Sequence, residues 1–256
     1  MNNIMIGCPV NKNRVLPSYL EHIRNLDYPK KKLHLSFLVN NCEDDTYDIL
    51  YTFREEYLNE YYDISLWNLD EIEEAYPDGN RYNKRNYEAF AKLRNVWISM
   101  MSDNDDYIFS VDSDVLIPPN SLKQLLLHDK KIISLLFPHE NDMYNIMKER
   151  TFQGRYNHIF EGSFERKLIK VAVTGGAILV HRDVLDDGVR YEYHRNGEDV
   201  AFCEIAREAG YDIYCDAGLE AKHIMRPNGK SPFEKLYPEW FKEKHPDWFE
   251  DKPRQK

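Results

Sequence analysis

Short apolar runs alternate with amphipathic stretches along the first half of the chain, and each kind of run predicts one kind of element. The apolar runs predict strands at 4–8, 33–41, 61–69, 107–111 and 131–137. The amphipathic stretches predict helices at 19–26, 47–57, 86–101 and 121–129. Because strands and helices alternate and the strands are continuously apolar, the pattern predicts an α/β fold with a mostly parallel, doubly wound sheet.

The second half of the chain is less regular. Polar and aromatic residues mix without a clear period from about 138 to 170, so no element is predicted there. The pattern resumes at 171–185, where Gly175 and Gly176 interrupt a strand pair, and continues with a helix at 197–210 and a strand at 211–216. No internal repeat or low-complexity linker divides the chain, which predicts one domain with a C-terminal extension.

The composition is that of a folded protein with an acidic surface. Hydrophobic residues make up 42% of the 256 residues, which is enough for a large core. The 44 acidic residues exceed the 34 Lys and Arg and give a net charge of −10. This charge disfavours binding to long nucleic acid unless a local basic patch overrides it, whereas a small anionic ligand needs only a metal or a few arginines.

The sequence shows no signal for export or for a membrane span. No run approaches ~18 consecutive apolar residues, and the first residues, MNNIMIGCP, lack the basic region and long apolar run of a signal peptide. Cys8, Cys42, Cys203 and Cys215 form no CxxC pair and lie in apolar or strand-like contexts, so we expect reduced core thiols rather than disulfides or zinc ligands. We therefore expect a soluble, cytoplasmic protein.

Polar residues at the predicted strand ends are the first candidates for a site, because ligands of open α/β sheets bind outside the carboxyl ends of the strands. These residues are Pro9, Asn11, Asn40, Asn41, Asp112, Asp114 and Asp216.

Asp112 and Asp114 come directly after the apolar run that starts at Tyr107. Alternate residues of an extended segment point the same way, so both carboxylates could face one hard cation such as Mg²⁺ or Mn²⁺. A bare DxD is common by chance, and an Asp-rich turn explains it as well. The apolar sequence on both sides favours the metal.

Two further groups carry acids or a histidine. Glu198 and Asp199 fall in the first turn of a predicted helix, where acids complement the helix dipole and where Asp199 could also serve as a general base. His223 follows the last predicted strand and could join two carboxylates around Mn²⁺, although a lone histidine is more often packed or on the surface.

Glycines and basic residues form the remaining candidates. Gly175 and Gly176 mark either a bulge or a place where a ligand approaches the backbone. Lys84, Arg85 and Arg94 could neutralise a diphosphate or simply lie on a solvated helix face. Arg85 and Arg94 are about half a turn out of phase, so the two are not expected to touch the same phosphate.

The order of these motifs resembles that of the GT-A glycosyltransferases over roughly residues 3–225. The segments that carry the resemblance are AKLRNVW, VDSDVLIPP, TGGAILV, GEDVAFCEIAREAGYDIYCD and KHIM. The Arg-Asn helix before the DxD strand is similar to the Anp1/mannan-polymerase type, and the GED helix is similar to family-2-like enzymes. The resemblance implies a Rossmann-like central sheet flanked by helices, with a nucleotide-binding half at 1–137 and an acceptor-binding and catalytic half at 138–225.

The resemblance also implies a role for each candidate on the donor side. Pro9 and Asn40 would line the nucleotide pocket together with Asn41. At the second strand end, where this chain has Asn40 and Asn41, the family often has an acid. Arg94 would approach the donor diphosphate. Asp112 would lie near the ribose or the water shell of the metal, and Asp114 would bind the metal directly.

The resemblance also implies roles for His223 and for the residues on the acceptor side. His223 would complete the metal shell, and Gly175 and Gly176 would let a sugar approach the backbone. Glu198 and Asp199 match an acidic pair whose aspartate is the base in inverting enzymes.

These assignments predict a glycosyltransferase that uses Mn²⁺ or Mg²⁺ to move a sugar from a UDP- or GDP-sugar to an acceptor hydroxyl on a glycan, a protein or another molecule. The GED pair favours inversion of configuration, whereas the mannan-polymerase similarity favours retention. A nucleotidyltransferase would need a Gly-rich, Lys- or Arg-bearing loop after the first strand, which this chain supplies poorly. A non-catalytic nucleotide-sugar-binding module is the alternative from another class. The aromatic residues of 226–256 could form a lid, an acceptor-binding flap, an interfacial anchor or a helix packed on the domain.

Overall fold

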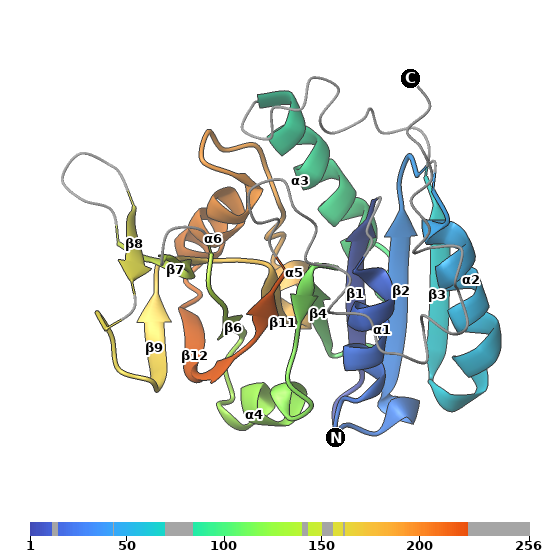
Figure 1. The fold of residues 1–256 in the computed structure, drawn as a ribbon. Helices are drawn as coiled ribbons and strands as arrows, with labels where there is room; N and C mark the ends of the chain where they lie inside the picture. The colour runs from blue at the N-terminus through green and yellow to red at the C-terminus, as the bar shows by residue number, and fades with distance from the viewer. Residues whose placement is uncertain are drawn as a thin grey trace, which may run out of the picture.

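The computed structural model of the protein describes residues 1–11, 15–42, 44–69, 84–139, 143–149, 156–160 and 162–224. Its centre is a sheet with the strand order β3-β2-β1-β4-β11-β6-β12-β9 (Figure 1). The strands of this sheet are β1 (Ile4–Val10), β2 (Leu33–Val39), β3 (Asp63–Asn68), β4 (Tyr107–Val111), β6 (Ile132–Leu136), β9 (Leu168–Val171), β11 (Ala177–His181) and β12 (Ile213–Glu220).

Most strands of the central sheet run in one direction. β1 pairs in parallel with both β2 and β4, β2 pairs in parallel with β3, and β12 pairs in parallel with β6. β11 is antiparallel to its neighbours β4 and β6, and β9 is antiparallel to β12. The predicted α/β fold with a mostly parallel sheet is therefore confirmed, and the carboxyl ends of β1, β2, β4 and β6 meet at one edge.

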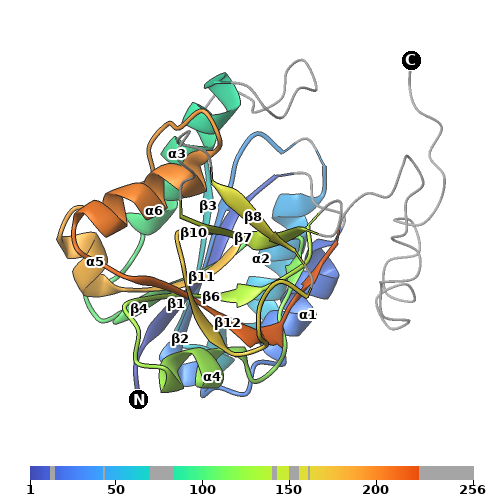
Figure 2. The same ribbon diagram turned by 90° about the vertical axis from the view of Figure 1, so that its left-hand side faces the viewer.

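Helices cover both faces of the sheet, as the two views of the ribbon show (Figures 1 and 2). The helices are α1 (Leu16–Arg24), α2 (Thr46–Tyr57), α3 (Lys84–Ile98), α4 (Ser121–Leu127), α5 (Arg182–Asp186) and α6 (Glu198–Glu208), with short 3₁₀ turns at Lys30–Lys32 and Leu58–Glu60. Apolar residues of α1, α2 and α4 join one buried core, and those of α3, α5 and α6 join the other. Alternation along β1 feeds both cores, since Ile4 and Ile6 face the first and Met5 faces the second.

Smaller strands lie beside the central sheet. β7 (Met143–Lys148) pairs with β8 (Asn157–Phe160) and with β10 (Val173–Thr174) in a three-stranded sheet. β5 (Val115–Leu116) pairs with β13 (Lys222–His223). No element was predicted at 138–170, and the presence of β7, β8 and most of β9 in this segment corrects that expectation.

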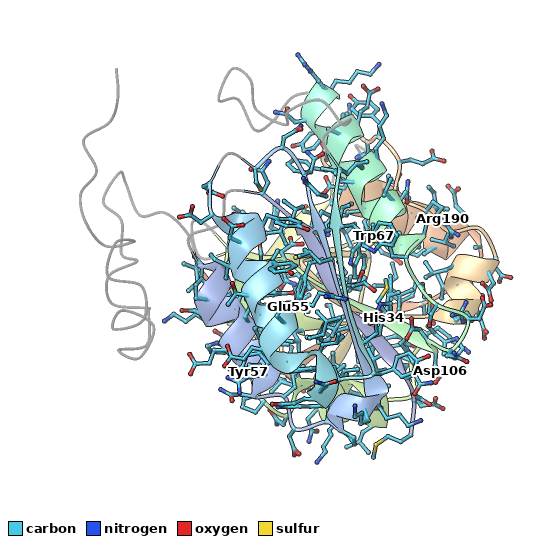
Figure 3. The ribbon with its side chains drawn as sticks, turned by 90° about the vertical axis from the view of Figure 1, so that its right-hand side faces the viewer. His34, Glu55, Tyr57, Trp67, Asp106 and Arg190 are labelled. Atoms are coloured by element: carbon cyan, nitrogen blue, oxygen red, sulfur yellow. The ribbon has the colours of Figure 1, made fainter. Side chains whose placement is uncertain are left out.

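A buried polar network ties the edge of the sheet to the loop before β4. His34 Nδ1 lies 2.9 Å from Asp105 Oδ2, and His34 Nε2 lies 2.9 Å from the Ser65 hydroxyl on edge strand β3. In Figure 3, His34 lies between Trp67 and Asp106 along this side of the molecule. Because Ser65 donates its own proton to Asp63, the network is a chain of structural hydrogen bonds rather than an activated serine.

Several expectations concern residues outside the described parts. The whole predicted C-terminal extension at 226–256 lies there, and the division at residue 137 stays a prediction. Cys8, Cys203 and Cys215 are buried free thiols, and Cys42 is a half-buried one. Within the described residues, no helix combines the length and the apolar character needed to cross a membrane.

Candidate functional site

A pocket of about 430 Å³ opens at the carboxyl ends of the parallel strands. It brings together residues from both halves of the chain. The predicted site residues that line it are Pro9, Asn40, Arg94, Asp112, Asp114, Gly175, Gly176, Glu198, Asp199 and His223. The candidates Asn41, Lys84, Arg85 and Asp216 do not line the pocket, so the expected nucleotide contact of Asn41 lacks support. Asn41 adopts a φ of 47°, in the left-handed region that asparagine tolerates.

The segment Asp112-Ser113-Asp114 is a turn rather than an extended strand end. The Val115 N–H donates to the Asp112 carbonyl at 2.8 Å, which closes the turn, and the Asp112 N–H donates to the Gly176 carbonyl at 2.8 Å. The expectation that both carboxylates point the same way along an extended chain is therefore wrong. Both still line the pocket, but their side chains have different partners.

Asp112 is held by Arg94 of helix α3. Arg94 Nη2 donates to Asp112 Oδ1 at 3.0 Å and to Oδ2 at 3.2 Å, Nη1 donates to the Ser110 hydroxyl, and Nε donates to Glu198 Oε1 at 3.2 Å. Burial raises the pKa of Asp112, and the Arg94 guanidinium opposes that shift. Acceptors of the protein itself thus engage all three nitrogens of Arg94, and the predicted contact with a diphosphate would have to compete with them.

Asp114 meets His223 on the opposite side of the turn. β13 places His223 opposite Val115 of β5, and His223 Nε2 lies 3.5 Å from Asp114 Oδ2. Burial lowers the pKa of His223, but the hydrogen bond and charge of Asp114, the charge of Asp112 and a hydrogen bond with the Pro138 backbone together raise it more, so the net shift is upward. One carboxylate and one imidazole therefore face the pocket as a pair.

This pair fits a divalent cation that keeps most of its shell for other ligands. Within the described residues, no group of three or more His, Cys, Asp or Glu is arranged to hold a metal ion. Mg²⁺ and Mn²⁺ in substrate sites use one or two protein ligands and complete the shell with water and phosphate oxygens. Asp114 and His223 meet that requirement, whereas Asp112 is engaged by Arg94.

Glu198 and Asp199 open helix α6, but their surroundings differ. Glu198 is 8% exposed, and its carboxylate already accepts from Arg94. Asp199 is half-buried and lines the pocket. Of the two acids, Asp199 is therefore the one placed to take a proton from a bound molecule.

The two glycines make room for side chains of the protein. A Cβ on Gly175 would lie 2.0 Å from Asp199 Oδ2, and a Cβ on Gly176 would lie 2.6 Å from the Phe137 ring. Gly176 also has a φ of +74°, which disfavours other residues. The resemblance assigned this space to an approaching sugar, and the structure fills it with the Asp199 and Phe137 side chains instead.

Pro9 and Asn40 lie at the ends of β1 and β2, as predicted. Asn40 is 1% exposed, and the Asn11 side chain donates to its carbonyl at 2.9 Å. Among the described residues, none makes a hydrogen bond with the buried Asn40 Oδ1. A buried acceptor in this state favours a ligand that brings a donor.

The sequence analysis missed one wall of the pocket. This wall comes from β7, β8 and their flanks, and its residues are His139, Tyr144, Asn145, Met147 and His158. Asn145 Nδ2 donates to the carbonyls of Leu135 and Gly175, and its Oδ1 accepts from the Phe137 N–H at 2.9 Å. Tyr87 and Phe90 of α3 also line the pocket.

One family model and several curated proteins match the chain. The model of the Anp1 family matches residues 1–157. Procollagen-lysine,2-oxoglutarate 5-dioxygenase of Drosophila melanogaster is 26% identical over 77% of this chain and 26% of its own length. Procollagen galactosyltransferase 1-A of Xenopus laevis is 26% identical over 57% of this chain and 24% of its own length. The chain thus spans about a quarter of the length of these curated relatives.

Solved structures share the fold at low sequence identity. GalNAc-T7 with UDP, GalNAc and Mn²⁺ superposes with a TM-score of 0.64 at 8% identity, over 90% of this chain and 45% of the other. The mannosyltransferase PcManGT from Pyrobaculum calidifontis, in complex with GDP-Man and Mn²⁺, superposes with a TM-score of 0.60 at 14% identity, over 89% of this chain and 58% of the other. These likenesses confirm the predicted fold class.

Proposed function

Because this chain belongs to the Anp1 family of GT-A glycosyltransferases, we propose that it transfers a sugar from a nucleoside-diphosphate sugar to an acceptor hydroxyl with inversion of configuration. One observation carries the proposal. The Asp114–His223 pair and the half-buried Asp199 line the same pocket, which lies at the carboxyl ends of the parallel strands. A donor held there would have its diphosphate near the Asp114–His223 pair, and an acceptor would have its hydroxyl near the Asp199 carboxylate.

The donor half of the pocket suits a nucleotide and its diphosphate. Asn40 Oδ1, which no described residue bonds, offers an acceptor to a base or ribose donor. Asp114 and His223 would hold Mn²⁺ or Mg²⁺, and such an ion neutralises the charge of the departing diphosphate. The solved relatives with UDP and Mn²⁺ and with GDP-Man and Mn²⁺ support this donor class, and either nucleotide is compatible with the site.

The acceptor half supplies the base. As the acceptor oxygen attacks the anomeric carbon, the bond from that carbon to the diphosphate oxygen breaks, and the leaving diphosphate takes the bonding electrons. The proton of the acceptor hydroxyl passes to an Asp199 carboxylate oxygen. Attack on the face opposite the leaving group inverts the anomeric centre. Glycans, proteins and other hydroxyl-bearing molecules are candidate acceptors, and a cytoplasmic location stays a prediction.

Two substitutions separate donor binding from transfer. The protein is incubated with Mn²⁺ and UDP- or GDP-sugars, and the release of nucleoside diphosphate and Mn²⁺-dependent donor binding are measured. Asp114→Asn should lower Mn²⁺-dependent donor affinity by at least tenfold, because it removes one of two protein ligands. Asp199→Asn should leave donor affinity within twofold and lower turnover by at least 10²-fold.

Asp103→Asn is the matched control, because Asp103 is exposed and follows α3 away from the pocket. It should match the wild type in both measurements. Wild-type turnover by Asp199→Asn contradicts the base assignment, and a product that retains the donor configuration contradicts inversion. A wild-type protein that neither binds nor turns over any nucleotide sugar contradicts the whole proposal.

A further inference from the structure

We propose that Arg94 and Glu198 form a clamp that positions Asp199 and joins it to the donor side of the pocket. In this role Glu198 orients the first turn of α6 and takes no part in proton transfer. This inference rests on the proposed function, because it assigns a positioning role within that site. The resemblance placed Arg94 on the diphosphate and Glu198 in an acidic catalytic pair. The contacts of both side chains in the structure favour a different division of roles.

Arg94 links two elements that are far apart in the sequence. From helix α3, its Nε donates to Glu198 at the start of α6, and its Nη2 donates to Asp112 at the end of β4. Arg94 and Glu198 are each 8% exposed, so water reaches little of the pair. A buried guanidinium that bonds two carboxylates in fixed directions sets the distance between the groups that carry them.

Helix α3 also holds the segment that leads into α6. The side chain of Asn95, next to Arg94, donates to the Tyr191 carbonyl at 2.7 Å and accepts from the Tyr191 N–H at 2.9 Å. The Tyr191 ring stacks on Phe202 of α6 at 4.5 Å between centroids, and the Arg94 guanidinium lies 5.4 Å from the centroid of the same ring. The clamp is therefore one part of a wider junction between α3 and α6.

The first turn of α6 depends on this junction. Its N-cap residue is Gly197, with a φ of 114° and no side chain to bond the free N–H groups. Glu198 is the first helical residue, and its side chain is held by the hydrogen bond from Arg94 Nε. Asp199 follows directly, and its carboxylate lies in the space left by the missing side chain of Gly175. The Arg94–Glu198 contact and the space at Gly175 thus both restrain the Asp199 carboxylate.

Three substitutions of Glu198 test whether it positions or reacts. Glu198→Gln keeps an oxygen that accepts from Arg94 Nε but cannot take a proton as a base, and we expect kcat within about threefold of the wild type. Glu198→Ala removes the acceptor, and Glu198→Asp shortens it by one methylene. Both should lower kcat at least tenfold while the KM and the Mn²⁺-dependent affinity for the donor stay within twofold, since Asp114 and His223 are unchanged.

Glu208→Gln, an exposed substitution at the other end of α6, is the matched control and should match the wild type. Loss of turnover in Glu198→Gln with intact donor binding would overturn the inference, because it would show a chemical role. Full turnover in Glu198→Ala would overturn it as well, because the clamp would then be dispensable.

Amide hydrogen exchange over 202–206, whose N–H groups bond the carbonyls of the first residues of α6, tests the clamp without any turnover. Exchange should quicken at least tenfold in Glu198→Ala and should stay near the wild-type rate in Glu198→Gln. Equal exchange in these two variants and the wild type would overturn the clamp itself. If the wild type lacks transfer but exchange responds as expected, the proposed function fails while the clamp stands.

Discussion

At the scale of single residues, Gly175 controls where Asp199 can lie. Its φ is ordinary, so Gly175→Ala adds no backbone strain, but the new Cβ would lie 2.0 Å from Asp199 Oδ2 and 2.3 Å from its carboxyl carbon. The carboxylate must therefore move, and we expect turnover to fall at least tenfold because a base displaced by about 1 Å loses much of its effect. Steady-state kinetics with a nucleotide-sugar donor measures this fall.

Gly218→Ala is the matched control for that change. Gly218 also lacks a positive φ, but its added Cβ would first meet Asp216 Oδ1 at 3.2 Å, a contact that a small shift relieves. Turnover should stay within twofold of the wild type. Equal effects of the two substitutions on turnover would show that Gly175 has no special relation to Asp199.

Residue types at strand ends could be predicted, and their contacts could not. Asp112, Asp114 and Asn40 were found because the polar residue after a buried parallel strand reaches the ligand edge of the sheet. The partners of Arg94 depend on how α3 lies against α6, more than a hundred residues away in the sequence. The wrong expectation of an extended segment at Asp112–Asp114 has the same origin, because the turn is closed by a hydrogen bond and held by Gly176, which directly precedes β11.

At the scale of elements, strand β7 supports the pocket through one side chain. Asn145 bonds the Phe137 N–H and the carbonyls of Leu135 and Gly175, so it fastens β7 to the end of β6 and to the glycine loop. Asn145→Ala leaves these partly buried backbone groups without that partner, which should lower the free energy of unfolding by about 2 kcal/mol. Urea denaturation followed by circular dichroism measures the change.

Asn157→Ala is the control for this element, because Asn157 lies exposed on the paired strand β8. Its free energy of unfolding should stay within about 0.5 kcal/mol of the wild type. If Asn145→Ala is no more destabilising than this control, the hydrogen bonds of Asn145 do not hold the hairpin in place.

The strands that the sequence did not reveal are the ones with weak apolar alternation. β7 buries Tyr144 and Ile146 but carries methionines on its less buried face, so its pattern has little contrast. β8 buries only Ile159. By contrast, β2 is buried at every position, and its continuous apolar run was predicted with only its end misplaced. A strand that forms mainly by pairing with the edge of a neighbouring strand has only a weak hydrophobic pattern in its own sequence.

At the scale of the whole molecule, the sheet separates two cores that both extend to the pocket floor. Val111, just before Asp112, belongs to the core on the side of α1, and Val200, just after Asp199, belongs to the core on the side of α6. The donor-side acids and the proposed base are therefore each anchored in a different core. The position of the base relative to the donor depends on the sheet and on the Arg94 junction between α3 and α6.

Buried thiols and phenols predict a loss of stability in alkaline solution. Burial raises the pKa of Cys203 and of Cys215 to about 12, and it raises the pKa of Cys8, Tyr19 and Tyr191 as well. In the unfolded chain, thiols ionise near pH ~8.5 and phenols near pH ~10. Groups with a raised folded pKa contribute their full stability below the unfolded pKa and lose it as the pH rises above that value.

The free energy of unfolding should therefore be nearly constant with respect to these groups up to about pH 8.5 and should then decline. Each thiol that ionises only on unfolding contributes a slope of about 1.4 kcal/mol per pH unit, and the phenols add to the slope above pH ~10. Urea denaturation in a reducing buffer between pH 7.5 and 10 measures this decline. Cys203→Ala should be less stable at neutral pH, because the substitution opens a small cavity. Above pH ~8.5, its free energy of unfolding should decline less steeply than that of the wild type, by about 1.4 kcal/mol per pH unit, because one thiol fewer ionises on unfolding. A slope equal to that of the wild type would show that Cys203 does not remain protonated in the folded protein.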